Sequence, residues 1–204
     1  RCENCDYAAN VEAAEFVREP GGSGEPGALQ KVATPNSRTI AELCAFLGIG
    51  PQQTLKIVFY TVPNGDGGRE LVLALLRGDL DVNEVKLLNA LGAADLEAAT
   101  EEEIAKVGGV AGYASPIGLD VRTEANPGGV LVLADESLRL LKNFTTGANE
   151  VDYHFLNVNY PRDFEVTRFA DIAEPYDGAT SLAARHHDLR GLVHCGDAAL
   201  STAP

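Results

Sequence analysis

The apolar run at residues 71–76 constrains the fold more than any other part of the sequence. Leu, Val and Ala follow one another there without a polar residue. A strand of this kind is buried on both faces, so we expect it at the centre of a β-sheet. Residues 55–62 predict a second strand, because they are rich in Ile, Val, Phe and Tyr. Between the two runs, residues 63–68 are typical of a turn.

Capping boxes mark the start of two helices. The first helix begins at the box formed by Thr39 and Glu42, and we expect it to end at Gly48. The second begins at the box formed by Thr100 and Glu103, and we expect it to end at residues 108–109. The remaining periodicity predicts a helix over residues 82–91 and strands over residues 130–134 and 155–160. The combination predicts an α/β (α+β) domain built on a mixed, largely antiparallel β-sheet flanked by helices.

Three regions differ in composition. Residues 1–30 contain a cysteine pair and a Gly- and Pro-rich stretch, so we interpret them as an entry segment and linker. Residues 31–172 alternate helix and strand signals and form the expected domain. Residues 173–204 are less periodic and are interpreted as a C-terminal edge or tail.

The charge and hydropathy of the chain limit its partners. Its 204 residues carry a formal net charge of −14, which argues against a general nucleic-acid binder. A few local cations would still suffice to hold the end of one nucleic acid. No apolar run approaches the ~20 residues needed to cross a bilayer, and the first residues do not resemble a signal peptide. We therefore expect a soluble, cytoplasmic protein that does not act on a membrane.

Six segments, in order along the chain, resemble the editing (insertion) domain of bacterial-type prolyl-tRNA synthetases and the related free-standing deacylases. They are residues 5–12, residues 34–43, residues 54–56, residues 77–79 with 83–87, residues 112–118, and the stretch from Phe144 through His154 to Phe164. The resemblance implies a tRNA-synthetase-associated editing domain fold. It covers the insertion only, since the signatures of the ATP-binding aminoacylation core do not occur. We therefore expect an excised domain or a free-standing relative that needs no ATP.

The implied activity is hydrolysis of a wrongly attached amino acid, most simply alanine, from proline tRNA. A pocket sized for proline gains only ~1–3 kcal/mol of discrimination from each missing methylene, so a second, smaller pocket supplies the remainder. The implied partners are the 3′ end of the tRNA and the rest of the synthetase. Two alternatives stay open: a deacylase specific for cysteine, and a module that binds the tRNA end without hydrolysis.

Three residues are the candidates for catalysis. The family match assigns Lys56 to the tRNA 3′ end, and the alternative is an ordinary strand-terminal lysine. Gly112 lies in a loop similar to the family's G-x-x-x-P loop, whose N–H groups would stabilise an oxyanion, and the alternative is a surface turn. The match places His154 beside the amino acid, where it would orient the substrate amine or a water, and the alternative is a structural histidine.

Four further residues are candidates for substrate binding. Thr34 and Leu43 match pocket positions of the family, although Leu43 also fits a helix core and Thr34 a loop. Ser115 and Pro116 belong to the glycine loop. No convincing Ser-His-Asp arrangement accompanies Ser115, so we expect attack by water rather than by a protein nucleophile.

Other polar residues have simpler interpretations. Asp79 or Asn83 is expected to cap the helix that follows, and Arg77 and Lys86 are secondary candidates for phosphate contact. Cys44 falls on the apolar side of its helix and is interpreted as a buried thiol.

The N-terminal cysteine pair raises the question of a metal. Cys2 and Cys5 form half of a zinc ribbon. Some synthetases of this type carry a second cysteine pair after the insertion. In this sequence Cys195 occupies one position of that pair, and Leu192 occupies the position where the other cysteine is expected. We expect no metal in the active site and no cofactor for hydrolysis. A structural zinc at Cys2, Cys5 and Cys195 stays open, with His186, His187 or His194 as a fourth ligand.

Overall fold

The computed structural model describes residues 14, 16, 18 and 24–175. Its elements form a three-stranded sheet, in the order β1-β7-β6, and a five-stranded sheet, in the order β4-β2-β3-β5-β8. The elements are β1 (Gln30–Ala33), α1 (Ile40–Leu47), η1 (Pro51–Gln53), β2 (Leu55–Pro63), β3 (Arg69–Arg77), α2 (Glu84–Leu91), β4 (Glu97–Ala98), α3 (Glu101–Lys106), β5 (Leu131–Asp135), η2 (Glu136–Leu140), β6 (Phe144–Gly147), β7 (Tyr153–Val158) and β8 (Arg168–Ala170).

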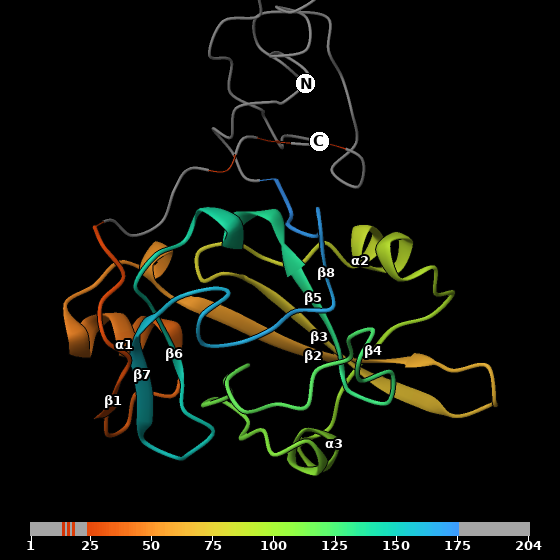
Figure 1. Ribbon diagram of the computed structural model, residues 1–204, viewed down its shortest axis with the longest axis horizontal. Coiled ribbons are helices and arrows are strands. Elements are labelled where there is room, and N and C mark those ends of the chain that lie inside the picture. The colour runs from red at the N-terminus through yellow and green to blue at the C-terminus, as the bar shows by residue number, and fades with distance from the viewer. Residues whose placement is uncertain (1–13, 15, 17, 19–23, 176–204) are drawn as a thin grey trace, which may run out of the picture.

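Strands β2 and β3 form the long antiparallel hairpin that crosses the molecule in Figure 1. At the tip, the side-chain oxygen of Asn64 accepts hydrogen bonds from the N–H groups of Asp66 and Gly68. Strand β3 is the middle strand of the five, and the side chains at positions 72–76 are fully buried. The predicted turn and the predicted central strand are both confirmed.

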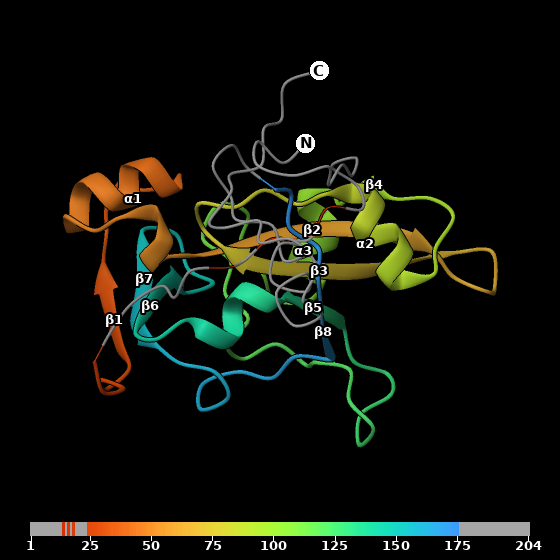
Figure 2. The same ribbon diagram turned by 90° about the horizontal axis from the view of Figure 1, so that it is seen from above.

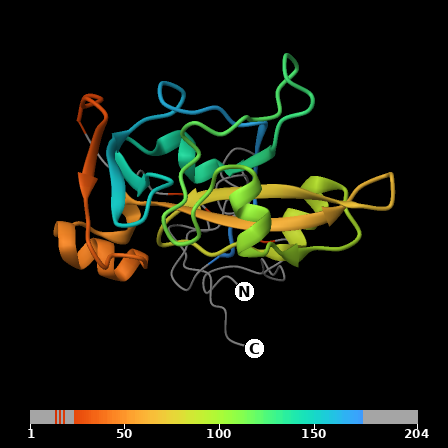
Figure 3. The same ribbon diagram turned by 90° about the horizontal axis from the view of Figure 1, so that it is seen from below.

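The two faces of the five-stranded sheet carry different helices. Leu73 and Leu75 share one apolar cluster with Ile104 of α3, whereas Val72 and Ala74 share another with Leu87 of α2. This separation follows from the alternation of side chains along a strand. Figure 1 shows α2 and α3 on opposite sides of the hairpin, and Figure 3 shows the α3 side from below.

The three-stranded sheet lies with α1 at one end of the hairpin (Figures 1 and 2). An isolated bridge between Thr54 and Thr145 joins the start of β2 to β6. In the described part of the chain, only the β3–β5 and β5–β8 pairs are parallel among the paired strands. The predicted mixed, largely antiparallel architecture flanked by helices is therefore confirmed, but it is divided between two sheets.

Helix starts agree with the sequence where a side chain caps them. Both capping boxes are present, at Thr39 and at Thr100, and Gly48 ends α1 with φ of 68°. Helix α2 starts later than residue 82, because Asn83 accepts a hydrogen bond from the N–H of Lys86 and caps it. Val82 instead forms a bridge with Ala173. The predicted capping role for this polar cluster thus belongs to Asn83.

Candidate functional site

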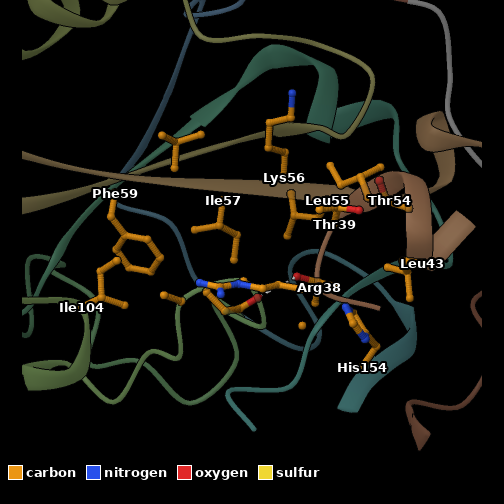
Figure 4. A pocket seen from close by; sticks show the side chains of 17 residues that line it. Arg38, Thr39, Leu43, Thr54, Leu55, Lys56, Ile57, Phe59, Ile104 and His154 are labelled. Atoms are coloured by element: carbon orange, nitrogen blue, oxygen red, sulfur yellow. Dashed lines mark hydrogen bonds between the residues drawn. The ribbon is translucent and has the colours of Figure 1, made fainter. Parts of the chain in front are cut away.

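A pocket of about 310 Å³ lies where the two sheets meet. Its walls come from six parts of the chain, several of them distant in sequence, as Figure 4 shows for the labelled side chains. They are the start of α1 with the residues before it, Thr54 with the first half of β2, Ile104 of α3, the loop at residues 111–114, the end of β6, and His154 of β7. The pocket therefore forms only when both sheets and the loop are in place.

Strand β2 presents alternate side chains to opposite sides. In Figure 4, Leu55, Ile57 and Phe59 point toward the side on which His154 lies, whereas Lys56 points away from it. The Lys56 ammonium donates to the carbonyl oxygen of Leu80 at 2.6 Å and to Asp81 at 2.8 Å. Lys56 thus contributes to the pocket wall, with its charge held on the other side of the strand.

The main chain of β2 is open along the pocket. Strand β4 pairs with β2 only at Tyr60 and Thr61, and the N–H of Ala99 donates to the carbonyl oxygen of Phe59. Residues two apart in a strand direct their main-chain groups to the same edge. Ile57 therefore directs its N–H and C=O to this edge, where no other described strand pairs with it.

His154 is held from behind by Thr34. The Thr34 hydroxyl lies 2.6 Å from the His154 Nδ1, so the other ring nitrogen, Nε2, stays available to the pocket. His154 is only 4% exposed, and burial lowers the pKa of its imidazole to about 4. Imidazole is therefore neutral at neutral pH, and it can orient a ligand but is a weak base.

The glycine loop is fixed by Asn149. Its side-chain oxygen accepts from the N–H of Ser115, and its amide group donates to the carbonyl oxygens of Ser115 and Ile117. Gly112 has φ of 85°, a conformation that favours glycine. Within residues 24–175, the N–H groups of Gly112 and Ala114 have no hydrogen-bond partner. Both residues line the pocket.

The structure brings four of the seven predicted site residues into one pocket lining: Lys56, Gly112, His154 and Leu43. Thr34 is buried behind His154 and reaches the site through it. Ser115 and Pro116 are buried and lie outside the lining, where they support the loop.

Sequence reasoning missed several wall residues. Arg38, Ile57, Thr146 and Gly147 all line the pocket. Arg38 stands within the segment that carries the family resemblance, immediately before a capping box, so its position in a matched loop was the available signal. Position 147 requires glycine because the main chain of Tyr113 and Ala114 lies so close that a Cβ would overlap it.

Arg77 and Lys86 do not form a phosphate-binding surface. Both are buried, with Arg77 bonded to Asp79 at 2.5 Å and Lys86 bonded to Asp171 at 3.0 Å. Cys44 is half-buried rather than fully buried, and partial burial raises the pKa of its thiol, which disfavours the nucleophilic thiolate.

The described residues contain no cluster of three or more His, Cys, Asp or Glu side chains arranged to hold a metal. The candidate zinc ligands Cys2, Cys5 and Cys195, and the three histidines near the C-terminus, lie outside the described residues. Within the described part of the chain, no helix has both the length and the apolar character needed to span a membrane.

Comparison with known proteins identifies the class. Residues 34–163 match the family model described as the aminoacyl-tRNA editing domain, and the chain belongs to this family. It is 43% identical over 178 residues to a proline–tRNA ligase of Dehalococcoides mccartyi, covering 87% of this chain and 29% of the relative. A proline–tRNA ligase of Caldicellulosiruptor bescii is 44% identical over 173 residues, covering 84% of this chain and 28% of the relative.

These matches confirm the resemblance to the editing domain of prolyl-tRNA synthetases. The chain spans less than a third of the length of the curated relatives that it matches. The fold is shared with a solved structure described as a putative trans-editing enzyme for prolyl tRNA synthetase. That similarity has a TM-score of 0.54 and 20% identity, and it covers 72% of this chain and 87% of the other.

Proposed function

We propose that the chain hydrolyses the ester of proline tRNA misacylated with a small amino acid, most readily alanine. One observation carries this proposal: the same small pocket is lined by a neutral histidine and by main-chain N–H groups that have no hydrogen-bond partner among the described residues. Its volume of about 310 Å³ is at the lower end for ligand sites. A small aminoacyl group fits this description better than a large one.

The chemistry needs positioning more than a strong nucleophile. An aminoacyl ester is already activated, so water can attack its carbonyl carbon. The bond from this carbon to the ribose oxygen breaks, and the leaving oxygen takes up the proton that the water loses. The N–H groups of Gly112 and Ala114 are suited to stabilise the oxyanion that develops in the transition state. His154, held by Thr34, orients the attacking water or the substrate amine through its Nε2. The main-chain oxygen of Ile57 is an acceptor for the substrate's ammonium group.

Selectivity follows from the walls. Leu55, Ile57 and Phe59 give the pocket an apolar side, and Ile104 packs beside them. Apolar walls distinguish amino acids by size and cannot strongly reject a smaller one. We propose that this pocket admits alanine and excludes the ring of proline, so correctly charged tRNA is spared.

The proposed partners are the 3′ end of proline tRNA and the remaining domains of a synthetase. Hydrolysis itself requires neither ATP nor a metal in this scheme. Lys56 remains the residue that the family resemblance assigns to the tRNA end, although its ammonium is bonded to Leu80 and Asp81 here.

The test compares substrates directly. The 204-residue chain is incubated with alanyl-, cysteinyl- and prolyl-tRNA-Pro, and loss of each ester is followed against spontaneous hydrolysis. We expect alanine to be released and proline to be retained. Faster release of cysteine would favour the cysteine-specific alternative. Binding of all three without hydrolysis would favour the binding module, and equal loss of proline would contradict size exclusion.

A further inference from the structure

Of the described residues that line the pocket, Arg38 and Lys56 carry the positive charges. They lie on different sides of β2. In Figure 4, the Arg38 side chain extends on the side of Ile57, Phe59 and His154, whereas Lys56 points away. The anionic part of a substrate whose reactive end lies near His154 therefore meets Arg38 first.

Arg38 is held so that its charge stays accessible. Its stem lies against Gly112, and a Cβ at position 112 would overlap the Cγ and Nε atoms of Arg38. The guanidinium donates to Glu101 at 3.2 Å. The Arg38 side chain is 61% exposed and that of Glu101 77% exposed, so this ion pair is solvated and weak. The glycine at 112 thus makes room for the cation as well as for the loop conformation.

We propose that Arg38 binds a backbone phosphate of the nucleotide chain that leads the aminoacyl ester into the pocket, and that Glu101 occupies its guanidinium until the phosphate replaces it. This inference rests on the proposed function. A backbone phosphodiester carries one negative charge, as a carboxylate does, and matches the planar guanidinium in the same two-pronged way. It can therefore replace Glu101, whose pair with Arg38 is solvated and weak. Arg38 is then a binding residue at the pocket entrance.

A local cation at the pocket lets an acidic chain bind an anion there. The net charge of −14 repels nucleic acid at long range. The exposed pair with Glu101 offsets only part of the charge of Arg38 in the free protein, so the guanidinium stays accessible to a phosphate. Glu101 would therefore weaken binding, because the substrate must displace it.

The probe is a short single-stranded oligonucleotide ending in CCA, with alanine joined to its 3′ end by an amide that the pocket cannot hydrolyse as an ester. We expect Arg38→Ala to weaken its binding about tenfold, as loss of a charge-assisted hydrogen bond does. The slope of log affinity against log salt should fall in magnitude by about 0.7, the value for one phosphate contact on a single strand. Arg38→Lys should restore the slope and only part of the affinity.

Two matched controls separate binding from folding. Arg139 is similarly exposed and paired with Glu136 but lies outside the pocket lining, so Arg139→Ala should leave affinity and salt slope unchanged. Glu101→Gln should tighten binding about twofold because the competing carboxylate is gone. Glu102→Gln, at the next position of the same helix, should not tighten it.

The outcomes are distinguishable from those of the proposed function. An unchanged salt slope in folded Arg38→Ala, or no binding of the probe by the wild-type chain, would overturn the role of Arg38. Normal Arg38-dependent binding of the probe, with no hydrolysis of alanyl-tRNA-Pro, would leave the Arg38 assignment standing and reject the deacylase.

Discussion

His154 owes its position to a partner 120 residues earlier in the chain. The Thr34 hydroxyl fixes one ring nitrogen, and the ring of Tyr113 packs against it with centroids 5.7 Å apart. Tyr113 is in turn fixed by a hydrogen bond from its hydroxyl to Asp152 at 2.9 Å. The histidine is therefore both buried and directed, which suits it to orient a ligand without titrating.

Burial of His154 predicts a pH dependence of stability. Its pKa falls from 6.5 in the unfolded chain to about 4 in the folded one, so the unfolded state binds the proton more readily between these values. The contribution is fully present above pH 6.5 and is lost at about 1.4 kcal/mol per pH unit as pH falls toward 4.

Urea unfolding at several pH values measures this dependence, and His154→Gln provides the control. The difference in the free energy of unfolding between the wild-type chain and His154→Gln should shrink steadily as pH falls below 6.5. Deacylation by the folded wild-type chain should show no inflection near pH 6.5, because the imidazole stays neutral there. A constant difference in stability across this range would contradict the buried neutral ring.

Lys56 gives the second prediction at this scale. Its ammonium pairs with Asp81, which is 82% exposed, so Lys56→Ala should cost at most about 1 kcal/mol of stability. If the lysine serves the tRNA end, deacylation should nearly disappear while the circular dichroism spectrum is kept. Asp81→Asn, which frees the lysine, should retain activity. Full activity in Lys56→Ala would leave the lysine a purely structural role.

Among the elements, the contact between β6 and the glycine loop determines the shape of the site. Gly147 lies where a Cβ would overlap the carbonyl groups of Tyr113 and Ala114, which are main-chain atoms and cannot turn away. We expect Gly147→Ala to destabilise the fold by about 1–3 kcal/mol through overpacking. Gly128→Ala is the matched control, because a Cβ there meets nothing within 4 Å.

The same substitution should also reduce activity beyond the loss of folded protein. A shift of the loop would move the N–H groups of Gly112 and Ala114 away from the position proposed for the oxyanion, and such donors act only when aligned. Rates are measured at a temperature where both variants are folded by circular dichroism. Unchanged kinetics in folded Gly147→Ala would show that loop position does not control catalysis.

The elements that sequence could predict are those whose signals are local. The capping boxes at Thr39 and Thr100, the apolar run of β3 and the turn before it each depend on residues within a few positions, and all are present. The short strands β1 and β6 carry no such signal, since Gln30–Ala33 and Phe144–Gly147 are strands only because β7 lies between them.

The site was predictable to the same extent. Family-matched positions identified His154 and Gly112, but the contacts that orient them join segments far apart in sequence, as Asn149 does for Ser115. Strand alternation gives the direction of the Lys56 side chain once it is known which face of β2 lines the pocket. No local sequence pattern indicates that face. Arg38 became a candidate only when the fold placed it against Gly112.

At the scale of the whole molecule, a buried charge network joins distant parts of the chain. Arg18 forms two hydrogen bonds with Asp135, at 2.9 and 3.0 Å, and also bonds to Asp171. Lys86 donates to Asp171 and to the carbonyl oxygen of Ala14. The network thus holds Ala14 and Arg18 against Asp171 and the end of β5.

Asp135 is the centre of this network. It is fully buried, and the bonded guanidinium of Arg18 helps to hold the pKa of its carboxyl below the usual range despite the opposing effect of burial. It also accepts hydrogen bonds from the N–H groups of Ser137, Ile172 and Ala173. The ends of β5 and β8 and residues near the N-terminus therefore share one carboxylate.

Removing that charge should destabilise the whole domain, because the guanidinium of Arg18 stays buried with one fewer partner. We expect Asp135→Asn to lower the free energy of unfolding by about 3–5 kcal/mol. Glu150→Gln, which breaks the exposed pair with Lys31, should cost no more than about 1 kcal/mol. Urea unfolding of both variants makes the comparison. Equal small losses would mean that the bonds between Arg18 and Asp135 contribute little to the stability of the domain that forms the pocket.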